Sequence, residues 1–367
     1  IYKDPILIDS TKIIRAIASK KDFLQTNVDT HSYIFPASVI KQKGTNPKLP
    51  RTWGGKPADY EMDPEIVNDP DYSELMIPSL EALPSLSIAI NPDDFYGASG
   101  IYQHPKSEGE RWERAISVEL LTKDGTEKGF QVNSGMRIQG GSSRNTDIPK
   151  HSFSLRFRKE YGSGKLNYPL FKNSPHGETA VQKFDYLQLR GGFNFGWTHR
   201  HYYQSKHAQY NRDQFANDIF LAMGNYGIHG RWTHLYINGL YWGIYHIHER
   251  PDADFMNAYF GEKELSYDAI NSSSATNGSI ASYNKMVTVA SNLVSSPQEY
   301  ENLKKHLHIE SFIDYMLLNF YIGNRDWDGH NWRAAGNGPS GEPFRFFPWD
   351  SEFALSPNNA GAIQSPN

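Results

Sequence analysis

Residues 235–247 read LYINGLYWGIYHI, two runs of aromatic and aliphatic residues that flank Asn238 and Gly239. Such residues suit the pleated surface of a strand, so both runs are typical of β-structure. An Asn-Gly pair supplies the two positive φ angles that a type I′ turn requires. The stretch therefore predicts a β-hairpin closed by a two-residue turn.

Further strands are predicted upstream of this hairpin. Each is a short run of β-branched or alternating apolar residues, bounded by Gly, Asn or Pro. The runs are SLSIAI (85–90), ISVELL (116–121), MRIQ (136–139), KHSFSLRFR (150–158) and FDYLQLR (184–190). In the last two, apolar and polar residues alternate, which predicts one face in solvent. Residues 85–250 are therefore expected to be rich in β-sheet.

One helix interrupts these strands. The stretch NRDQFANDIFLAMGNYG (211–227) places four apolar residues on one helical face, and the pattern ends at Gly224. The four residues are Phe215, Ile219, Ala222 and Met223. We expect a helix of about three turns that packs through this face.

Residues 251–367 change to a helical pattern. Apolar residues over 280–294 predict one helix, and a second opens with the N-cap Ser296, Pro297 and the capping-box Glu299. A third is predicted by apolar residues that recur three and four positions apart, a pattern typical of a buried face. They are Ile309, Phe312, Ile313, Met316, Leu317, Phe320 and Tyr321. A β-rich region followed by an α-rich one makes the fold class α+β.

The N-terminal part has a different character. Residues 11–34 alternate on both sides of a polar break, which predicts two strands at the end of a β-sandwich within residues 1–40. Residues 41–84 are rich in Pro, Gly, Asn and Asp, and predict a linker or an ordered strap. In the strap interpretation, Trp53 and Tyr60 fill grooves.

Composition excludes several classes of function. The chain has 367 residues, 38% of them hydrophobic and 14% aromatic, so it can bury a core. With a net charge of -4, the chain lacks the excess of positive charge that is typical of proteins that bind nucleic acid or an anionic membrane surface. No apolar run approaches the length of a membrane span. With 0 Cys, side-chain metal ligands are limited to His, Asp, Glu and Asn.

The loop after the third helix has a spacing that suits phosphoryl transfer. In IGNRDWDGHN (322–331), Asn331 follows Asp326 by five residues. Kinase catalytic loops use this spacing because the Asp accepts the proton of the substrate hydroxyl while the Asn holds a metal ion on the phosphates. A solvated turn is the alternative that spacing alone leaves open.

An aromatic strand further on ends in a carboxylate. FRFFPWD (344–350) ends in Asp350, and Glu352 follows two residues later. Oxygen ligands of this kind suit Mg²⁺, so Asn331, Asp350 and Glu352 are candidate metal ligands. The alternative is that Asp350 caps the next turn.

Candidate phosphate-binding groups lie upstream. In RIQGGSSR (137–144) a strand breaks into Gly140, Gly141 and Ser142, whose backbone N–H groups would wrap phosphates. Lys150 opens the following strand, where a kinase keeps the lysine that contacts the α and β phosphates. A plain β-turn and a surface lysine are the alternatives.

Seven motifs stand in the order of the CotH kinase-like family along about residues 130–355: RIQGGSSR, PKHSFSLRF, LQLRGG, NRDQFANDIF, YINGLYWGIYHIHE, NRDWDGHN and FPWD. This resemblance implies a bilobed atypical protein-kinase fold, with a β-rich N-lobe over 85–250 and a helical C-lobe over 251–367. It also implies ATP with Mg²⁺ or Mn²⁺ as cofactors. The implied reaction is phosphorylation of Ser or Thr in a secreted, surface or spore-coat-like bacterial protein.

The resemblance assigns roles to residues. Asp326 would be the catalytic base, and the metal would be held by Asn331, Asp350 and Glu352. The nucleotide would be bound by Gly140, Gly141, Ser142 and Lys150, while Glu249 would meet adenine at a hinge or form a contact between lobes. Arg190 and Arg212 match family positions, as phosphate contacts or structural ion pairs. Residues 11–34 resemble the last strands of the immunoglobulin-like module of large secreted bacterial proteins, which implies neighbouring domains and an extracellular or cell-surface location.

Three features depart from the family pattern. Asn324 replaces the usual loop His, and Glu352 replaces a second Asp. No Glu clearly corresponds to the helix-C glutamate of ordinary kinases. Asp213 and Asp218 are candidates for its role, with shorter side chains. An inactive kinase-fold surface or adhesion module is therefore the alternative function.

Histidine pairs suggest another class of enzyme. His199 and His201, like His246 and His248, stand two residues apart, and on a strand they would share a face as zinc ligands. Metal-assisted hydrolysis would follow from such a site. Structural, hydrogen-bonded histidines are the alternative.

Overall fold

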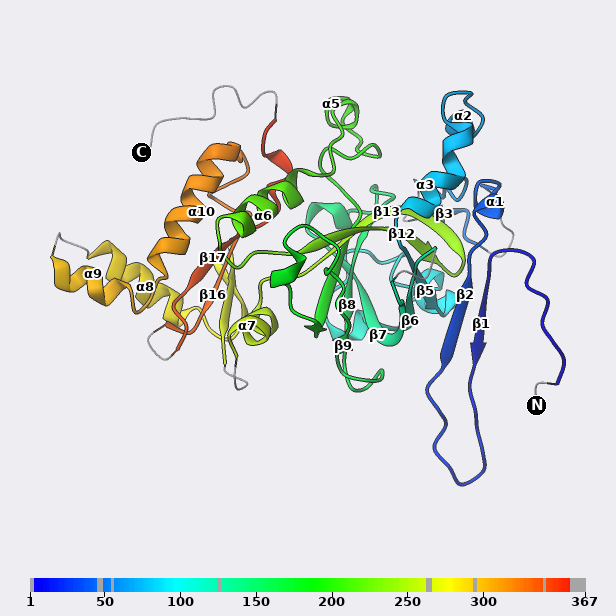
Figure 1. The fold of residues 1–367 in the computed structure, drawn as a ribbon, viewed down its shortest axis with the longest axis horizontal. Coiled ribbons are helices and arrows are strands. Elements are labelled where there is room, and N and C mark those ends of the chain that lie inside the picture. The colour runs from blue at the N-terminus through cyan, green and yellow to red at the C-terminus, as the bar shows by residue number, and fades with distance from the viewer. Residues whose placement is uncertain are drawn as a thin grey trace. The chain divides into compact units, whose positions relative to one another are not determined.

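The computed structural model describes residues 3–44, 49–53, 56–123, 127–261, 266–292, 296–338 and 341–356. The chain forms two compact units whose segments interleave along the sequence. The barrel unit comprises Ile1–Tyr168, Leu187–Gly191 and Trp232–Ile247, and the helical unit comprises Pro169–Tyr186, Gly192–Arg231 and His248–Asn367. The predicted α+β class is confirmed, since both sheets and helices are present (Figure 1).

A closed barrel of strands forms the centre of the barrel unit. Its order is β11-β13-β12-β5-β6-β7-β8. The strands are β5 (Ser85–Ile90), β6 (Arg114–Leu121), β7 (Phe130–Gln139), β8 (Ser152–Arg156), β11 (Tyr186–Arg190), β12 (Gly230–Ile237) and β13 (Leu240–His248). Leu86, Val118 and Phe153 are fully buried side chains of these strands. The strands were predicted, whereas their closure into a barrel was not.

The turn between β12 and β13 is the predicted one. Asn238 has φ 50° and Gly239 has φ 82°, as a type I′ turn requires. The Asn238 side chain has a second role, because its Oδ1 accepts a hydrogen bond of 2.9 Å from the Ile90 N–H at the end of β5. The turn thereby joins the hairpin to its parallel neighbour.

The described residues between 36 and 82 contain a series of short elements. They are α1 (Pro36–Val39), β3 (Thr52–Trp53), β4 (Lys56–Pro57), α2 (Pro64–Val67) and α3 (Met76–Ala82). Trp53 and Tyr60 are buried, and the indole N–H donates to the Tyr60 hydroxyl at 2.9 Å. The Trp53 ring also packs against Tyr102 and Trp242. Both rings are therefore part of the packed interior of the barrel unit.

The N-terminal strands β1 (Lys12–Ala16) and β2 (Asp29–Tyr33) pair antiparallel in a separate two-stranded sheet. Ser32 ties β2 to the barrel: its hydroxyl donates to Glu119 Oε2 at 2.5 Å and hydrogen-bonds the Ser87 hydroxyl at 2.7 Å. The predicted strands are present. Their origin in an immunoglobulin-like module stays a prediction.

The helical unit contains the predicted helices and a sheet. Its main helices are α6 (Arg212–Ala222), α7 (Ala253–Phe260), α8 (Ala281–Ser291), α9 (Pro297–Leu303) and α10 (Ile309–Ile322). A four-stranded sheet, of order β15-β14-β16-β17, consists of β14 (Asp268–Asn271), β15 (Ser274–Asn277), β16 (Trp332–Gly336) and β17 (Arg345–Pro348). Short elements elsewhere in the chain are α4 (Pro92–Tyr96), α5 (Tyr202–Lys206), β9 (Leu166–Asn167) and β10 (Lys183–Phe184). Ser296 caps α9 as predicted, since its hydroxyl accepts from the Glu299 N–H.

The predicted buried faces of α6 and α10 are only partly correct. In α10, Ile309 of the predicted stripe is buried, and Phe312 and Met316 pack against the core, but the other core residues are Tyr315, Leu318 and Ile322, and four members of the stripe are exposed. The exposed members are Ile313, Leu317, Phe320 and Tyr321. In α6 the buried residues include Ala216 and Phe220, while the predicted Phe215 and Met223 are exposed. Apolar residues occupy both sides of these helices, so packing rather than periodicity selects the buried face.

Every helix in the described part of the chain is too short or too polar to cross a lipid bilayer.

Candidate active site

Two predicted metal ligands lie at the same end of the β16–β17 hairpin. Trp332 of β16 is paired with Pro348 of β17 in an antiparallel register. Asn331 immediately precedes Trp332, and Asp350 follows Pro348 by two residues. Paired Cα atoms in such a ladder are about 4.5–5.5 Å apart, so the backbone brings Asn331 and Asp350 into one neighbourhood.

The backbone at both positions leaves the strand conformation. Asn331 has φ 61° and Asp350 has φ 57°, in the left-handed region. Asn and Asp enter this region more readily than most residues, but it is still sparsely populated. Such conformations concentrate at ligand sites because the surrounding structure must hold them in place. This observation supports the predicted roles independently of the spacing.

Asp326 lies in the turn after α10, whose C-cap Gly323 has φ 54°. The Asn331 amide Nδ2 donates to Asp326 Oδ2 at 2.7 Å, and His330 Nε2 lies 2.5 Å from Asp326 Oδ1. Because the Asn331 nitrogen is used in this bond, its carbonyl Oδ1 is the atom left for a cation. The predicted base and one predicted metal ligand are therefore in direct contact.

His330 and Asn324 complete this loop. His330 is largely exposed beside Asp326 and was not predicted as a site residue. Its position four residues after Asp326 was the only signal for it in the sequence. Asn324, which stands where the family keeps a His, is buried and accepts from the Asp326 backbone N–H through Oδ1 at 3.4 Å. It thereby positions the loop.

The start of α6 holds the segment that carries Asp350 and Glu352. Asp213 Oδ1 accepts from the Ser351 N–H at 2.7 Å, and Arg212 Nη1 donates to the Glu352 carbonyl at 3.2 Å. Glu352 itself accepts from the Asn194 N–H through Oε2 at 3.1 Å. Asp213, considered above as a substitute for the helix-C glutamate, is bonded here to the segment that carries the predicted metal ligands Asp350 and Glu352.

A buried cation lies close to this segment. The Arg333 guanidinium of β16 is 3% exposed and packs 4.1 Å from the centre of the Trp349 ring. Burial lowers the pKa of Arg333 to about 9, against the opposing influence of the carboxylates of Asp252 and Asp350. Arg333 therefore places a buried positive charge near the end of the β16–β17 hairpin.

Lys150 is the cation of the barrel unit that the resemblance assigns to nucleotide phosphates. Its Nζ donates to the Ile244 carbonyl at 2.9 Å and lies 4.7 Å from the centre of the Tyr245 ring. Burial lowers the pKa of Lys150 to about 8. Among the described residues it makes no ion pair, so its charge is uncompensated and suited to an anionic ligand.

Two glycines make space for the Lys150 side chain. Gly243 has φ 106°, and a Cβ there would lie 3.3 Å from Lys150 Nζ. A Cβ on Gly191 would lie 3.3 Å from Lys150 Cγ. The lysine therefore passes Gly243 of β13 and Gly191, just after β11, at two points where the backbone carries no side chain.

The predicted glycine turn is bonded to His151, the residue that follows Lys150. Gly140 has φ 127°, and a Cβ there would lie 2.1 Å from Ser143 Oγ, so glycine is required. Gly141 and Ser142 are exposed. The Ser143 carbonyl hydrogen-bonds His151 Nδ1 at 2.8 Å, and burial lowers the pKa of His151 to about 4. A neutral imidazole therefore fixes the turn to the start of β8.

Glu249, predicted to meet adenine or to form a contact between lobes, is held by side chains of the helical unit. It is 3% exposed in the helical unit, and its Oε2 accepts from the His229 N–H at 2.9 Å and lies 2.8 Å from His229 Nδ1. The Tyr259 hydroxyl donates to Oε1 at 2.8 Å, and the negative Glu249 contributes to a raised pKa of Tyr259 that burial dominates. Both carboxylate oxygens are occupied, so the structure supports a structural role.

Replacing Glu249 with Ala is expected to lower the free energy of unfolding by about 3–5 kcal/mol. The change removes a buried carboxylate and leaves its buried hydrogen-bond partners unpaired. The measurement is urea unfolding followed by tryptophan fluorescence. Glu178→Ala is the matched control, since Glu178 is an exposed carboxylate near this network and its loss should cost at most ~0.5 kcal/mol. Equal midpoints for both variants would contradict the role assigned to Glu249.

The histidine pairs do not form a zinc site. The His199 and His201 rings are 6.4 Å apart, and His199 Nδ1 accepts from the His201 N–H. His246 packs on Trp232, and His248 packs on Trp349. Across the described ranges, no group of three or more His, Cys, Asp or Glu is placed to hold a metal ion. A set of carboxylate and amide oxygens completed by water, as Mg²⁺ prefers, fits the hairpin end better.

Comparisons with known proteins agree with the motifs. None of the curated proteins searched matches this chain. A family model described as CotH kinase protein matches residues 136–365. The match includes Lys150 and the loop with Asp326, together with both strands of the β16–β17 hairpin. Since it covers more than half of the sequence, the chain belongs to the CotH kinase family.

Proposed function

We propose that this protein transfers the terminal phosphoryl group of ATP to a Ser or Thr hydroxyl of another protein, with Mg²⁺ or Mn²⁺ as the metal. The observation that carries the proposal is the meeting of Asp326 with Asn331 at the hairpin end that also bears Asp350. Family membership and the uncompensated charge of Lys150 support it further.

Asp326 is the residue proposed to accept the proton of the acceptor hydroxyl. A hydrogen bond from Asn331 and a 2.5 Å contact with His330 Nε2 hold its carboxylate in one orientation, which a general base requires. Asn331 Oδ1, Asp350 and Glu352 would hold the metal ion. When bound, that ion neutralises the charge on the phosphate oxygens.

The proposed nucleotide contacts come from the barrel unit. Lys150 would donate to phosphate oxygens, and the exposed backbone of Gly141 and Ser142 would offer N–H groups to them. Gly140 gives the turn its shape through its positive φ. Glu249 is left out of the nucleotide site because its oxygens already serve His229 and Tyr259.

The acceptor is proposed to be a secreted or cell-surface bacterial protein, and the chain itself to lie outside the cell among further domains. The family resemblance supports this location. The N-terminal hairpin supports further domains, because it exposes Phe23 at 67% and Leu24 at 98% between its two strands. Apolar side chains exposed together are typical of a surface that another domain covers.

A kinase-fold surface module without turnover is the second candidate. Asn324 in place of the family's loop His favours it, as does the engagement of Glu352 with the Asn194 backbone. The two candidates differ in their outcome with nucleotide. A pseudokinase binds ATP without transferring phosphate, or does not bind it.

Thermal unfolding with ATP, with Mg²⁺, and with both is the test of the proposed function. We expect the combination to raise Tm well beyond either ligand alone, because binding at 100 times Kd stabilises the folded state by about 2.7 kcal/mol. No shift with the combination, with Mn²⁺ also tried, would contradict the proposal.

Repeating the thermal unfolding measurements at several pH values tests whether Lys150 contacts the nucleotide. Its pKa of about 8 lies below its ordinary 10.5, so protonation opposes folding and the ligand-free protein should gain stability as the pH rises from 8 to 10.5. The Tm shift caused by Mg-ATP should instead shrink above pH 8, as the lysine loses the charge that attracts phosphate. Lys150→Arg should keep the shift at high pH, and Lys150→Met should weaken it at every pH. A pH-independent shift in the wild type would argue against the contact.

A further inference from the structure

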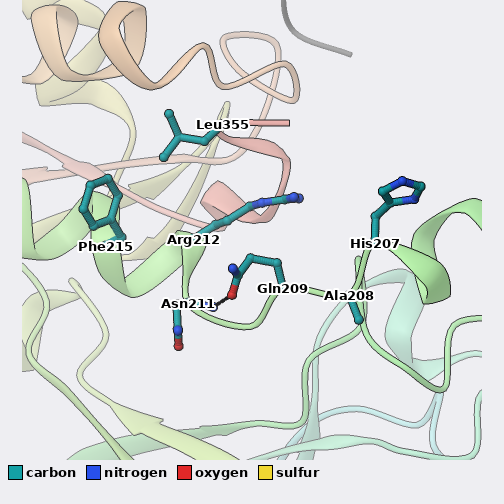
Figure 2. A pocket seen from close by; sticks show the side chains of 7 residues that line it. All are labelled: His207, Ala208, Gln209, Asn211, Arg212, Phe215 and Leu355. Atoms are coloured by element: carbon teal, nitrogen blue, oxygen red, sulfur yellow. Dashed lines mark hydrogen bonds between the residues drawn. The ribbon is translucent and has the colours of Figure 1, made fainter. Parts of the chain in front are cut away.

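A pocket of about 480 Å³ lies in the helical unit, beside the segment that carries Glu352. Its walls come from the start of α6, the residues just before it, and Leu355. Figure 2 shows Arg212 extending between Leu355 and Gln209, with Phe215 at one side and His207 at the other. The pocket is of the size that small ligands and peptide side chains occupy.

Arg212 provides the charge of this pocket. The side chain belongs to a residue only 9% exposed, yet it makes no ion pair among the described residues. Its contacts are one hydrogen bond to the Glu352 carbonyl and the Phe195 ring, 4.3 Å from the guanidinium carbon. A guanidinium has five N–H donors in a planar fork, which matches a carboxylate. Burial lowers the pKa of Arg212, as expected for a cation without a counter-charge.

Two apolar side chains flank the cation. Phe215 is 44% exposed and Leu355 is 47% exposed, although both are large apolar residues. Leu355 has φ 50° and is held by a hydrogen bond of 2.8 Å from its N–H to the Ile322 carbonyl at the end of α10. A small inorganic anion bound to Arg212 would leave Phe215 and Leu355 exposed to water. A ligand with both an anionic and an apolar group would pair with Arg212 and cover the two apolar side chains.

We propose that this pocket docks the acceptor protein through an acidic side chain next to an aliphatic or aromatic one. The carboxylate binds Arg212, and the apolar neighbour covers Phe215 and Leu355. The proposal rests on the proposed kinase function, because it gives that reaction its acceptor. Since Arg212 also holds the Glu352 carbonyl, docking would take place against the proposed metal-site segment.

The test is fluorescence polarisation with labelled degenerate nonapeptide pools that contain Ser and a fixed central Glu-Leu, Gln-Leu, Lys-Leu or Glu-Ser pair. We expect the Glu-Leu pool to bind at least about tenfold more tightly than each of the others, as one buried charged hydrogen bond or one large apolar contact allows. Phe215→Ser and Leu355→Ser should each weaken Glu-Leu binding several-fold. Leu317→Ser is the matched control, since Leu317 of α10 is also a large exposed apolar residue, 55% exposed, and does not line the pocket, so this variant should bind as the wild type does.

Arg212→Lys keeps the positive charge of the pocket but removes the planar set of guanidinium N–H donors. It should bind the Glu-Leu pool more weakly than the wild type while still preferring it to the Lys-Leu pool, because lysine is a point charge. Its melting temperature, measured in parallel, shows whether the fold is intact. Phe215→Ser and Leu355→Ser keep the proposal testable if this variant unfolds.

The outcomes distinguish docking from catalysis. Equal binding of the four pools, or no effect of Phe215→Ser and Leu355→Ser, would overturn the docking site and leave the Mg-ATP result standing. Displacement of the peptide by ATP without Mg²⁺ would also overturn it, because the pocket would then belong to nucleotide. Selective Glu-Leu binding in a protein that ignores Mg-ATP would support the pocket and contradict the kinase function.

Discussion

Asp326→Asn is expected to lower the rate of phosphate transfer from ATP by roughly 10²–10⁴-fold, the usual contribution of a general base. Asn has nearly the same shape as Asp and can still contact Asn331 and His330, so the loop should keep its conformation. What it loses is the capacity to accept a proton. The measurement is incorporation of label from γ-labelled ATP into the protein itself and into an added Ser/Thr-rich acceptor.

Asp328→Asn is the control for this experiment. Asp328 lies two residues further along the same loop, is exposed, and has no hydrogen-bond or ion-pair partner among the described residues. The same chemical change there should leave transfer within about twofold, as for other surface substitutions. The assignment of Asp326 would be wrong if both variants retained wild-type transfer, or if both lost it equally.

The second large effect is expected at Asp350. Asp350→Asn should weaken Mg²⁺-dependent ATP binding by at least about 100-fold, because losing a mere hydrogen-bond partner of a metal ligand already costs roughly 10–100-fold. Asn is the appropriate replacement, since Asp350 has φ 57° and Asn tolerates that region better than Ala. Calorimetric titration of ATP at saturating Mg²⁺ would measure the loss.

The Asp350→Asn variant also separates binding from transfer. Asp326→Asn should bind Mg-ATP as the wild type does, whereas Asp350→Asn should not. An unchanged melting temperature of the ligand-free protein would show that the hairpin end is intact. Normal Mg-ATP affinity in Asp350→Asn would remove this residue from the metal site.

Local patterns in the sequence predicted most of the strands and helices. The Asn238-Gly239 turn and the Ser296 cap are short-range devices whose chemistry is visible in consecutive residues. Barrel closure is not of this kind, because it depends on pairings such as β5 with β12, whose strands lie far apart in the sequence. The buried faces of α6 and α10 were misjudged for a related reason: both sides carry apolar residues, and only tertiary packing decides between them.

The candidate site shows the same division. Spacing and motif order predicted Asp326, Asn331 and Asp350 as site residues, and the register of β16 and β17 explains why Asn331 and Asp350 lie at the same hairpin end. The roles of Asp213 and Arg333 depend on contacts with Ser351 and Trp349, which no local pattern encodes. The contacts of Glu249 with His229 and Tyr259 form only through the fold, so no local pattern indicates them.

The first turn of α6 imposes a constraint on how this protein can diversify. Asp213 bonds the Ser351 amide and Arg212 bonds the Glu352 carbonyl, so neither residue can change without moving the loop on which the chemistry is proposed to depend. Phe215, one turn further along the helix, has no such bond, and Leu355 contributes only its backbone to the core. Relatives that serve other partners are therefore expected to vary at Phe215 and Leu355 while retaining the arginine and aspartate beside them.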